Sequence, residues 1–76
     1  MSKKGTASKY AKSLGDAMKV LRHLKGIGLR EHARQLDMSP ATLSRIERGY
    51  ECDLSTVAWI SEKTGISVDR LLGLKS

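Results

Sequence analysis

Apolar residues recur three or four positions apart along most of this 76-residue chain, which is the spacing of amphipathic helices. The apolar positions of the first such stretch are Leu14, Ala17, Met18, Leu21 and Leu24. Ser13 is a residue type that caps helices, and Asp16 stands three residues later in a pattern like a capping box. The pattern therefore predicts a helix that begins at Ser13 and ends at the Gly26-Ile27-Gly28 turn.

Two short helices joined by a tight turn are predicted next. The first covers residues 29–36 and the second covers residues 40–48. Ser39 is the expected cap of the second, and Pro40 stands at its first position, where a missing N–H does no harm. Gly49 should end this helix in a left-handed conformation.

A fourth helix should follow the cap residue Asp53 and end at Gly65, and Ser67 should cap a short fifth helix. The residues predicted to face inward from the second helix onward are Ala33, Leu36, Leu43, Ile46, Leu54, Val57, Ala58, Ile60, Val68, Leu71 and Leu72. The sequence shows no strand of useful length. The predicted fold class is all-α, a compact bundle of five helices.

Positive charge is concentrated in the first part of the chain. Residues 1–50 hold eleven Lys and Arg against four Asp and Glu, whereas residues 51–76 hold three against four. This imbalance favours a polyanionic partner such as nucleic acid, although a basic surface without a partner has the same composition. Residues 1–12 are predicted to be a flexible basic arm on a folded domain of residues 13–76. The arm would lie along phosphates or in a minor groove, or would be an ordinary chain terminus.

Several classes of protein are disfavoured by the sequence. No apolar run approaches 18 residues and the basic N-terminus lacks an apolar segment, so neither a membrane span nor a secretory signal is expected. Cys52, the single cysteine, suits a reducing cytoplasm, and Glu51 and Asp53 should raise the pKa of an inert thiol. His23 and His32 lack zinc spacing, and no phosphate-binding glycine loop is present, so no metal or cofactor is expected. No catalytic set stands out, which argues against an enzyme.

Two segments have the order and spacing of a known family. They read LREHARQLDMSPATLSRIERG and LSTVAWISEKTGISVDRLLG. Together they resemble the phage repressor and Cro family of helix-turn-helix proteins, the XRE-like DNA-binding domains, over roughly residues 14–73. The resemblance implies a five-helix domain, double-stranded operator DNA as ligand and transcriptional control as the role. It also implies a bacterial or phage-encoded protein of the cytoplasm that associates with the nucleoid.

The resemblance also assigns DNA contacts to individual residues. Residues 40–48 would be the recognition helix, which enters the major groove. The residues at base-contacting positions are Ser39, Pro40, Ala41, Ser44 and Arg45. The residues expected to contact the DNA backbone are Arg30, Arg34, Thr42, Arg48 and Tyr50. Arg45 is the best candidate for sequence reading because a guanidinium pairs bidentately with guanine, and the Ala41 methyl can pack on a thymine methyl.

One structural pair and two departures emerge from the same comparison. Family members often join the first helix to the end of the third by an Arg–Glu ion pair, and Arg22 and Glu47 occupy those places. Gly28 and Leu29 stand where many members have a Ser or Thr cap and a phosphate-binding Gln, so the positive charge of Arg30 or Arg34 should replace that phosphate contact. His32 occupies a usually apolar inward position, either as a partly buried neutral side chain or pointing outward.

Apolar residues near the C-terminus leave two interpretations open. Trp59 either covers the edge of the core or anchors a contact with another protein. Leu71, Leu72 and Leu74 exceed what a small core always needs, which makes them candidates for the surface of a two-fold homodimer.

These features predict a sequence-specific DNA-binding transcriptional regulator. It would be a repressor that binds a pseudo-palindromic operator as a homodimer, with half-sites about 34 Å apart. The alternative is an antitoxin- or adaptor-type protein whose main role is to bind another protein through Trp59 and the C-terminal leucines. RNA binding is a weaker third hypothesis, because the three aromatic residues are scattered and form no stacking platform.

Overall fold

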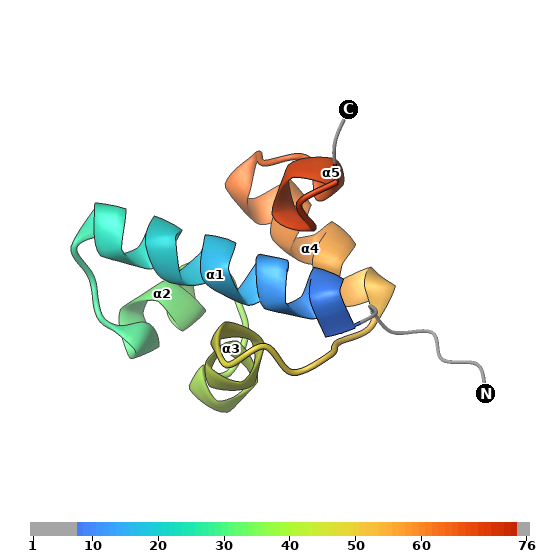
Figure 1. Cartoon of the computed structure of the whole chain (residues 1–76). Coiled ribbons are helices and arrows are strands. Elements are labelled where there is room, and N and C mark those ends of the chain that lie inside the picture. Colours follow the sequence, from blue (N-terminus) through green and yellow to red (C-terminus); the bar gives the residue numbers. More distant parts are fainter. Residues whose placement is uncertain (1–7, 75–76) are drawn as a thin grey trace.

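The computed structural model describes residues 8–74, and this part of the chain is all-α and contains no strand. Its elements are α1 (Ser8–Lys25), α2 (Leu29–Gln35), α3 (Pro40–Glu47), α4 (Leu54–Thr64) and α5 (Val68–Leu71). Helix α1 crosses the middle of the domain, with α2 and α3 on one side and α4 and α5 on the other (Figure 1). The predicted fold class and number of helices are confirmed.

The start of α1 differs from the prediction. The helix already includes Ser8, so Ser13 lies inside it and is not its N-cap. Residues 8–12, assigned to the arm by sequence, are helical, and Ala11 among them is fully buried. Residues 1–7 lie outside the described part of the chain. The prediction was wrong because a cap signal in the sequence cannot exclude a helix that begins further upstream.

The ends of the other helices follow local sequence signals closely. The Ser39 Oγ accepts a hydrogen bond from the Thr42 N–H at 3.1 Å, and Pro40 is the first residue of α3. The Ser67 Oγ accepts from the Arg70 N–H at 3.3 Å at the start of α5. Asp53 occupies the N-cap position of α4, but its side chain makes no capping hydrogen bond.

One continuous core joins all five helices. Its buried residues are Leu14, Met18, Ala33, Leu36, Leu43, Ile46, Val57, Ile60, Leu71 and Leu72. Three residues predicted to face inward do not. Leu24 is 80% exposed near the end of α1, Leu54 is exposed as the first residue of α4, and Ala58 lies off the face that buries Val57 and Ile60.

Candidate nucleic-acid interface

Helices α2 and α3 form a helix-turn-helix whose turn is residues 36–39. Asp37 adopts a left-handed conformation with φ of 56°, which reverses the chain in a short distance. Behind it, the Met38 N–H donates to the Ala33 carbonyl at 3.0 Å and the Asp37 N–H to the Arg34 carbonyl at 3.1 Å. The turn therefore fixes α3 relative to α2 through the backbone itself.

Helix α4 holds this turn from the outside. The Trp59 indole N–H donates to the Leu36 carbonyl at 2.8 Å, which satisfies a carbonyl at the end of α2. The Lys63 ammonium lies 2.8 Å from the Asp37 carboxylate and 4.8 Å from the centroid of the Trp59 ring. Trp59 is 41% exposed, so part of its ring remains open to solvent while its N–H is held by the turn.

A glycine allows α1 to approach the end of α3 closely. A methyl group added at Gly15 would overlap the Ile46 carbonyl oxygen and lie 3.1 Å from that of Glu47. The sequence analysis did not single out Gly15. The available signal was a glycine inside a strongly helical apolar pattern, which often marks a close packing contact.

The expected ion pair between α1 and α3 is present. The Arg22 Nε donates to the Glu47 Oε2 at 2.8 Å, and the Arg22 Nη2 donates to Oε1 at 3.0 Å. Glu47 is buried, and the hydrogen bonds to it raise the pKa of Arg22. Both carboxylate oxygens of Glu47 accept from Arg22, so the pair links the last turn of α3 to α1.

The outer side of α3 collects the residues assigned to base contacts. Ala41 and Arg45 are exposed one turn apart, and Ser39 is exposed at the N-terminal end of the helix. Pro40 and Ser44 are half-buried beside them. The opposite side of α3 carries the buried Leu43 and Ile46, which pack in the core. The amphipathic pattern of the helix thus turns the small and basic side chains to solvent.

The residues assigned to contacts with the DNA backbone are also exposed. The two arginines of α2 among them differ in whether a neighbouring carboxylate already pairs with their charge. Arg34 pairs with Glu31 at 2.7 Å, and this hydrogen bond lowers the pKa of the Glu31 carboxyl. Arg30 makes no ion pair with any described residue. Of the two arginines expected to replace the missing Gln, Arg30 therefore has the freer positive charge.

The basic surface extends from α3 onto α1. Residues of both helices line a shallow depression of about 630 Å³. Its cationic members are Lys12, Lys19 and Arg48, and its acidic members are Asp16, which pairs with Lys12 at 3.6 Å, and Glu47, which pairs with Arg22. Gly49 and Tyr50 also line this depression. Lys19 was not predicted as part of this surface, because only the packing of α1 across the end of α3 brings it there.

A sequence model of a helix-turn-helix domain matches residues 13–69, which is most of the described chain. The chain belongs to this helix-turn-helix domain family. The match confirms the resemblance to XRE-like DNA-binding domains and indicates a DNA-binding regulator, of a kind that is typically non-enzymatic. No curated protein and no solved structure matches the chain.

Three observations concern a membrane span, a metal site and the thiol of this helix-turn-helix domain. Among residues 8–74, no helix is long and apolar enough to cross a membrane. The same residues hold no group of three or more His, Cys, Asp or Glu side chains arranged to bind a metal ion. Cys52 is half-buried, and burial, more than the neighbouring Asp53, raises the pKa of its thiol. The predicted direction of that shift is confirmed, but its main cause is burial.

The predicted partner surface at the C-terminus is largely absent. Leu71 and Leu72 are buried in the core and cannot contact a partner, whereas Leu74 is 40% exposed. The sequence could not separate these leucines because α5 is a single turn, too short to show a clear periodicity. Trp59 and Leu74 are the members of the predicted surface that remain accessible.

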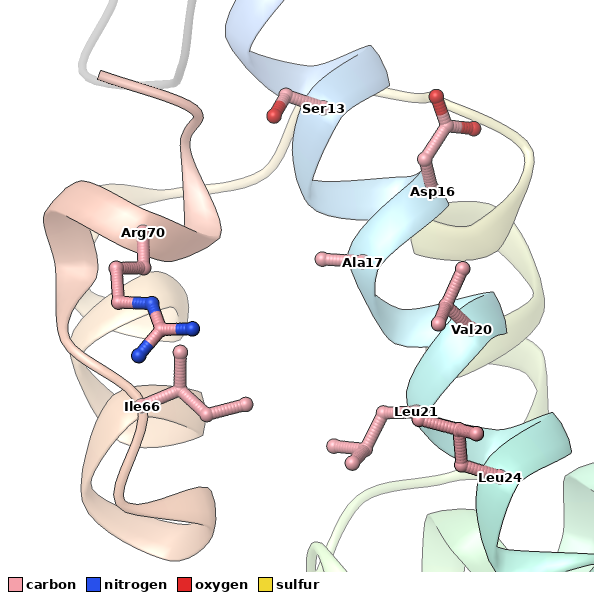
Figure 2. Close-up of a pocket in the computed structure, with 8 residues that line it drawn as sticks. All are labelled: Ser13, Asp16, Ala17, Val20, Leu21, Leu24, Ile66 and Arg70. Atoms are coloured by element: carbon pink, nitrogen blue, oxygen red, sulfur yellow. The ribbon is translucent and has the colours of Figure 1, made fainter. Parts of the chain in front are cut away.

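An apolar groove of about 490 Å³ lies instead between α1 and the segment that includes α5. Figure 2 shows Leu21 and Ile66 pointing toward one another from opposite walls, with Val20 before and Leu24 after Leu21 along α1. Asp16 and Arg70 add opposite charges to its lining. This groove involves neither α2 nor α3, and it shares only Asp16 with the lining of the depression between α1 and the end of α3.

Proposed function

We propose that this helix-turn-helix domain is a transcriptional repressor that binds a pseudo-palindromic operator as a homodimer. The observation that supports it most strongly is the exposed side of α3. There a guanidinium, a methyl group and a hydroxyl lie on a helix anchored to α1 by a buried ion pair. A helix so presented fits the major groove, where these groups distinguish base pairs.

The proposed division of labour follows the chemistry of each side chain. Arg45 pairs with the O6 and N7 of a guanine, Ala41 packs on a thymine methyl, and Ser39, Pro40 and Ser44 approach neighbouring base edges. The residues proposed to contact phosphates are Arg30, Arg34, Thr42, Arg48 and Tyr50. These phosphate contacts set the register and much of the affinity but not the choice of sequence.

A homodimer would place two copies of α3 about 34 Å apart, one turn of the duplex, on half-sites related by a two-fold axis. Occupation of promoter DNA would then block transcription, in the cytoplasm of a bacterium and on nucleoid or phage DNA. Of the residues predicted for a dimer surface, Trp59 and Leu74 are exposed enough to take part.

The test begins with selection of duplexes from a random pool by the full chain at roughly physiological salt. Arg45→Ala should then weaken binding to the enriched duplex by about 1–3 kcal/mol and relax the preference at one base pair per half-site. Arg70→Ala is the matched control, since Arg70 is also exposed but lies on α5 beside the apolar groove. An equal loss for both variants, or an equal loss on random DNA, would contradict direct reading by Arg45.

The α1–α5 groove favours a second candidate function, an adaptor- or antitoxin-type protein that binds another protein. Val20 is 56% exposed beside this groove and Leu24 even more so. Leu24→Lys and Arg45→Ala separate the two functions when each variant replaces the wild-type chain in a cell whose growth or reporter output depends on that chain. A repressor should be disabled by the second change, whereas an adaptor should be disabled by the first.

A further inference from the structure

The C-terminal end of α3 has the geometry of a Schellman motif. The Gly49 N–H donates to the Ile46 carbonyl at 3.0 Å, and the Tyr50 N–H donates to the Arg45 carbonyl at 3.0 Å. Gly49 has a φ of 88°, in the left-handed region that the motif requires. In this arrangement the last residue returns beside the first, and the two side chains commonly touch. The backbone therefore dictates that Tyr50 lies next to Arg45.

The ring of Tyr50 contacts both arginines of the last turn. The Cζ of Arg45 lies 5.0 Å from the ring centroid, and the Cζ of Arg48 lies 5.2 Å from it. Both distances fall within the range of cation–π attraction. Neither guanidinium makes a hydrogen bond or ion pair with another described residue. Tyr50 is thus the side chain that restrains these two otherwise freely exposed cations.

We propose that Tyr50 is a positioning residue that determines specificity, because its ring holds the Arg45 guanidinium in the direction of the base edges before DNA arrives. This inference rests on the proposed function, in which Arg45 reads a guanine. A long side chain that is already restrained loses less conformational freedom when it pairs with a base, and pre-organisation of this kind strengthens binding. The gain in discrimination should be confined to the base pair that Arg45 contacts in each half-site, because Arg45 is the base-contacting side chain that the ring restrains.

This role differs from the phosphate contact assigned to Tyr50, and two substitutions separate them. Tyr50→Phe keeps the ring and removes the hydroxyl, whereas Tyr50→Leu removes the ring and keeps an apolar side chain. A phosphate contact through the hydroxyl predicts that both variants lose affinity on every sequence alike. Positioning of Arg45 predicts that only the Leu variant loses discrimination. Tyr50 is 47% exposed and lies outside the helices, so both variants should fold.

A measurement without DNA tests the stacking itself. The aromatic ring should shift the NMR signals of the Arg45 side chain upfield in the wild-type chain and in Tyr50→Phe. The shift should disappear in Tyr50→Leu. Signals of Arg45 that are the same in all three chains would overturn the proposal whatever the chain binds.

A measurement with DNA tests the consequence. Two duplexes are compared. One is the duplex enriched by the wild-type chain, and the other differs from it only at the base pair that Arg45→Ala no longer distinguishes. Tyr50→Leu should lower the discrimination between these two duplexes about 2- to 5-fold, the range expected for an exposed cation–π contact. Tyr50→Phe should keep this discrimination, although loss of a phosphate contact through the hydroxyl would lower affinity for both duplexes alike. Discrimination at the other base pairs should not change.

The possible failures are distinguishable. If the wild-type chain shows no preference for any sequence, the proposed function is wrong, and the role of Tyr50 in it falls as well. If the wild-type chain and Arg45→Ala behave as expected but Tyr50→Leu keeps full discrimination, the positioning role alone is wrong. Loss of discrimination in Tyr50→Phe to the same extent as in Tyr50→Leu would also contradict it.

Discussion

At the scale of the single residue, His32 is an imidazole enclosed in the core. Its side chain has no exposed surface, and neither ring nitrogen has a hydrogen-bond partner among the described residues. Burial lowers the pKa of His32, helped by Lys25 and Arg22 of α1 and opposed by Glu47 of α3. Of the two conformations open from sequence, the structure has the buried one. The sequence alone could not decide between them, because the position of His32 favours burial whereas its polar side chain favours exposure.

His32 should make the domain sensitive to acid. Because its pKa is lower in the folded state than the ordinary 6.5, the unfolded chain binds more protons once the pH falls below that value. Stability is therefore complete above about pH 6.5 and declines as the pH falls toward the lowered pKa. His32→Leu should reduce this acid dependence. It should also raise Tm by about 4 °C or more, because an unsatisfied buried polar group costs about 1–3 kcal/mol.

Thermal unfolding of the wild-type chain and of His32→Leu between pH 5 and 7.5 checks this prediction. His23→Gln is the control, because it removes an exposed histidine and leaves the core unchanged. A decline toward acid that survives in His32→Leu but vanishes in His23→Gln would contradict the assignment.

Glu47 should matter to stability more than to sequence preference. Its bidentate pair with Arg22 is buried, so Glu47→Ala leaves a guanidinium without its partner and should lower Tm by about 10 °C or more. Glu31→Ala is the matched control, since it removes an equally short but exposed pair with Arg34. That change should stay within about 4 °C. A larger change in base preference than in Tm for Glu47→Ala would show that Glu47 reads DNA.

At the scale of the element, the helix boundaries could be predicted wherever the signal is local. The caps at Ser39 and Ser67 and the left-handed stops at Gly49 and Gly65 depend on one or two neighbouring residues, and the structure contains all four. The start of α1 and the burial of Leu71 depend on packing between distant segments. Such packing leaves no local mark in the sequence. The start of α1 was therefore predicted wrongly, and Leu71 was correctly expected to face inward but was also kept as a candidate for a partner surface.

Apart from the Arg22–Glu47 pair, which the family resemblance supplied, the contacts between elements were beyond sequence reasoning for the same reason. The hydrogen bond from the Trp59 indole N–H to the Leu36 carbonyl joins residues that are 23 positions apart. The approach of α1 to the last turn of α3 likewise depends on a residue with no side chain, Gly15. The side of α3 that carries the base-contact candidates and the Arg22–Glu47 pair could be predicted, whereas the contacts through Trp59 and Gly15 could not.

Gly15→Ala should destabilise the domain even though Ala is the better helix former by about 1 kcal/mol. The added methyl would meet backbone atoms of α3, which cannot rotate away as a side chain could, so α1 must move from α3. We expect a net loss of about 2 kcal/mol in the free energy of unfolding. Denaturant unfolding of Gly15→Ala and of Gly28→Ala, whose methyl would meet no atom within 4 Å, checks this. An increase in stability for Gly15→Ala would show that the helices do not approach so closely.

At the scale of the whole molecule, the basic surface spans α3 and the start of α1, and the sequence places two further lysines at Lys3 and Lys4. A deletion that tests the proposed arm should stop at residue 7, because a longer one removes the buried Ala11 of α1. If the arm contacts phosphates, deletion of residues 1–7 should reduce the slope of log affinity against log salt by about 1–2. Tm should stay the same. An unchanged slope would mean that the arm takes no part in binding.

The central claim is that α3 reads DNA through Arg45 in a two-fold symmetric complex. The most direct measurement is to repeat the selection from random duplexes with Arg45→Gln and to compare its motif with that of the wild-type chain. Glutamine pairs bidentately with adenine, whereas arginine pairs with guanine. We predict that the two motifs are two-fold symmetric and differ at one position per half-site, where guanine becomes adenine. Identical motifs, or no motif from the wild-type chain, would contradict the account.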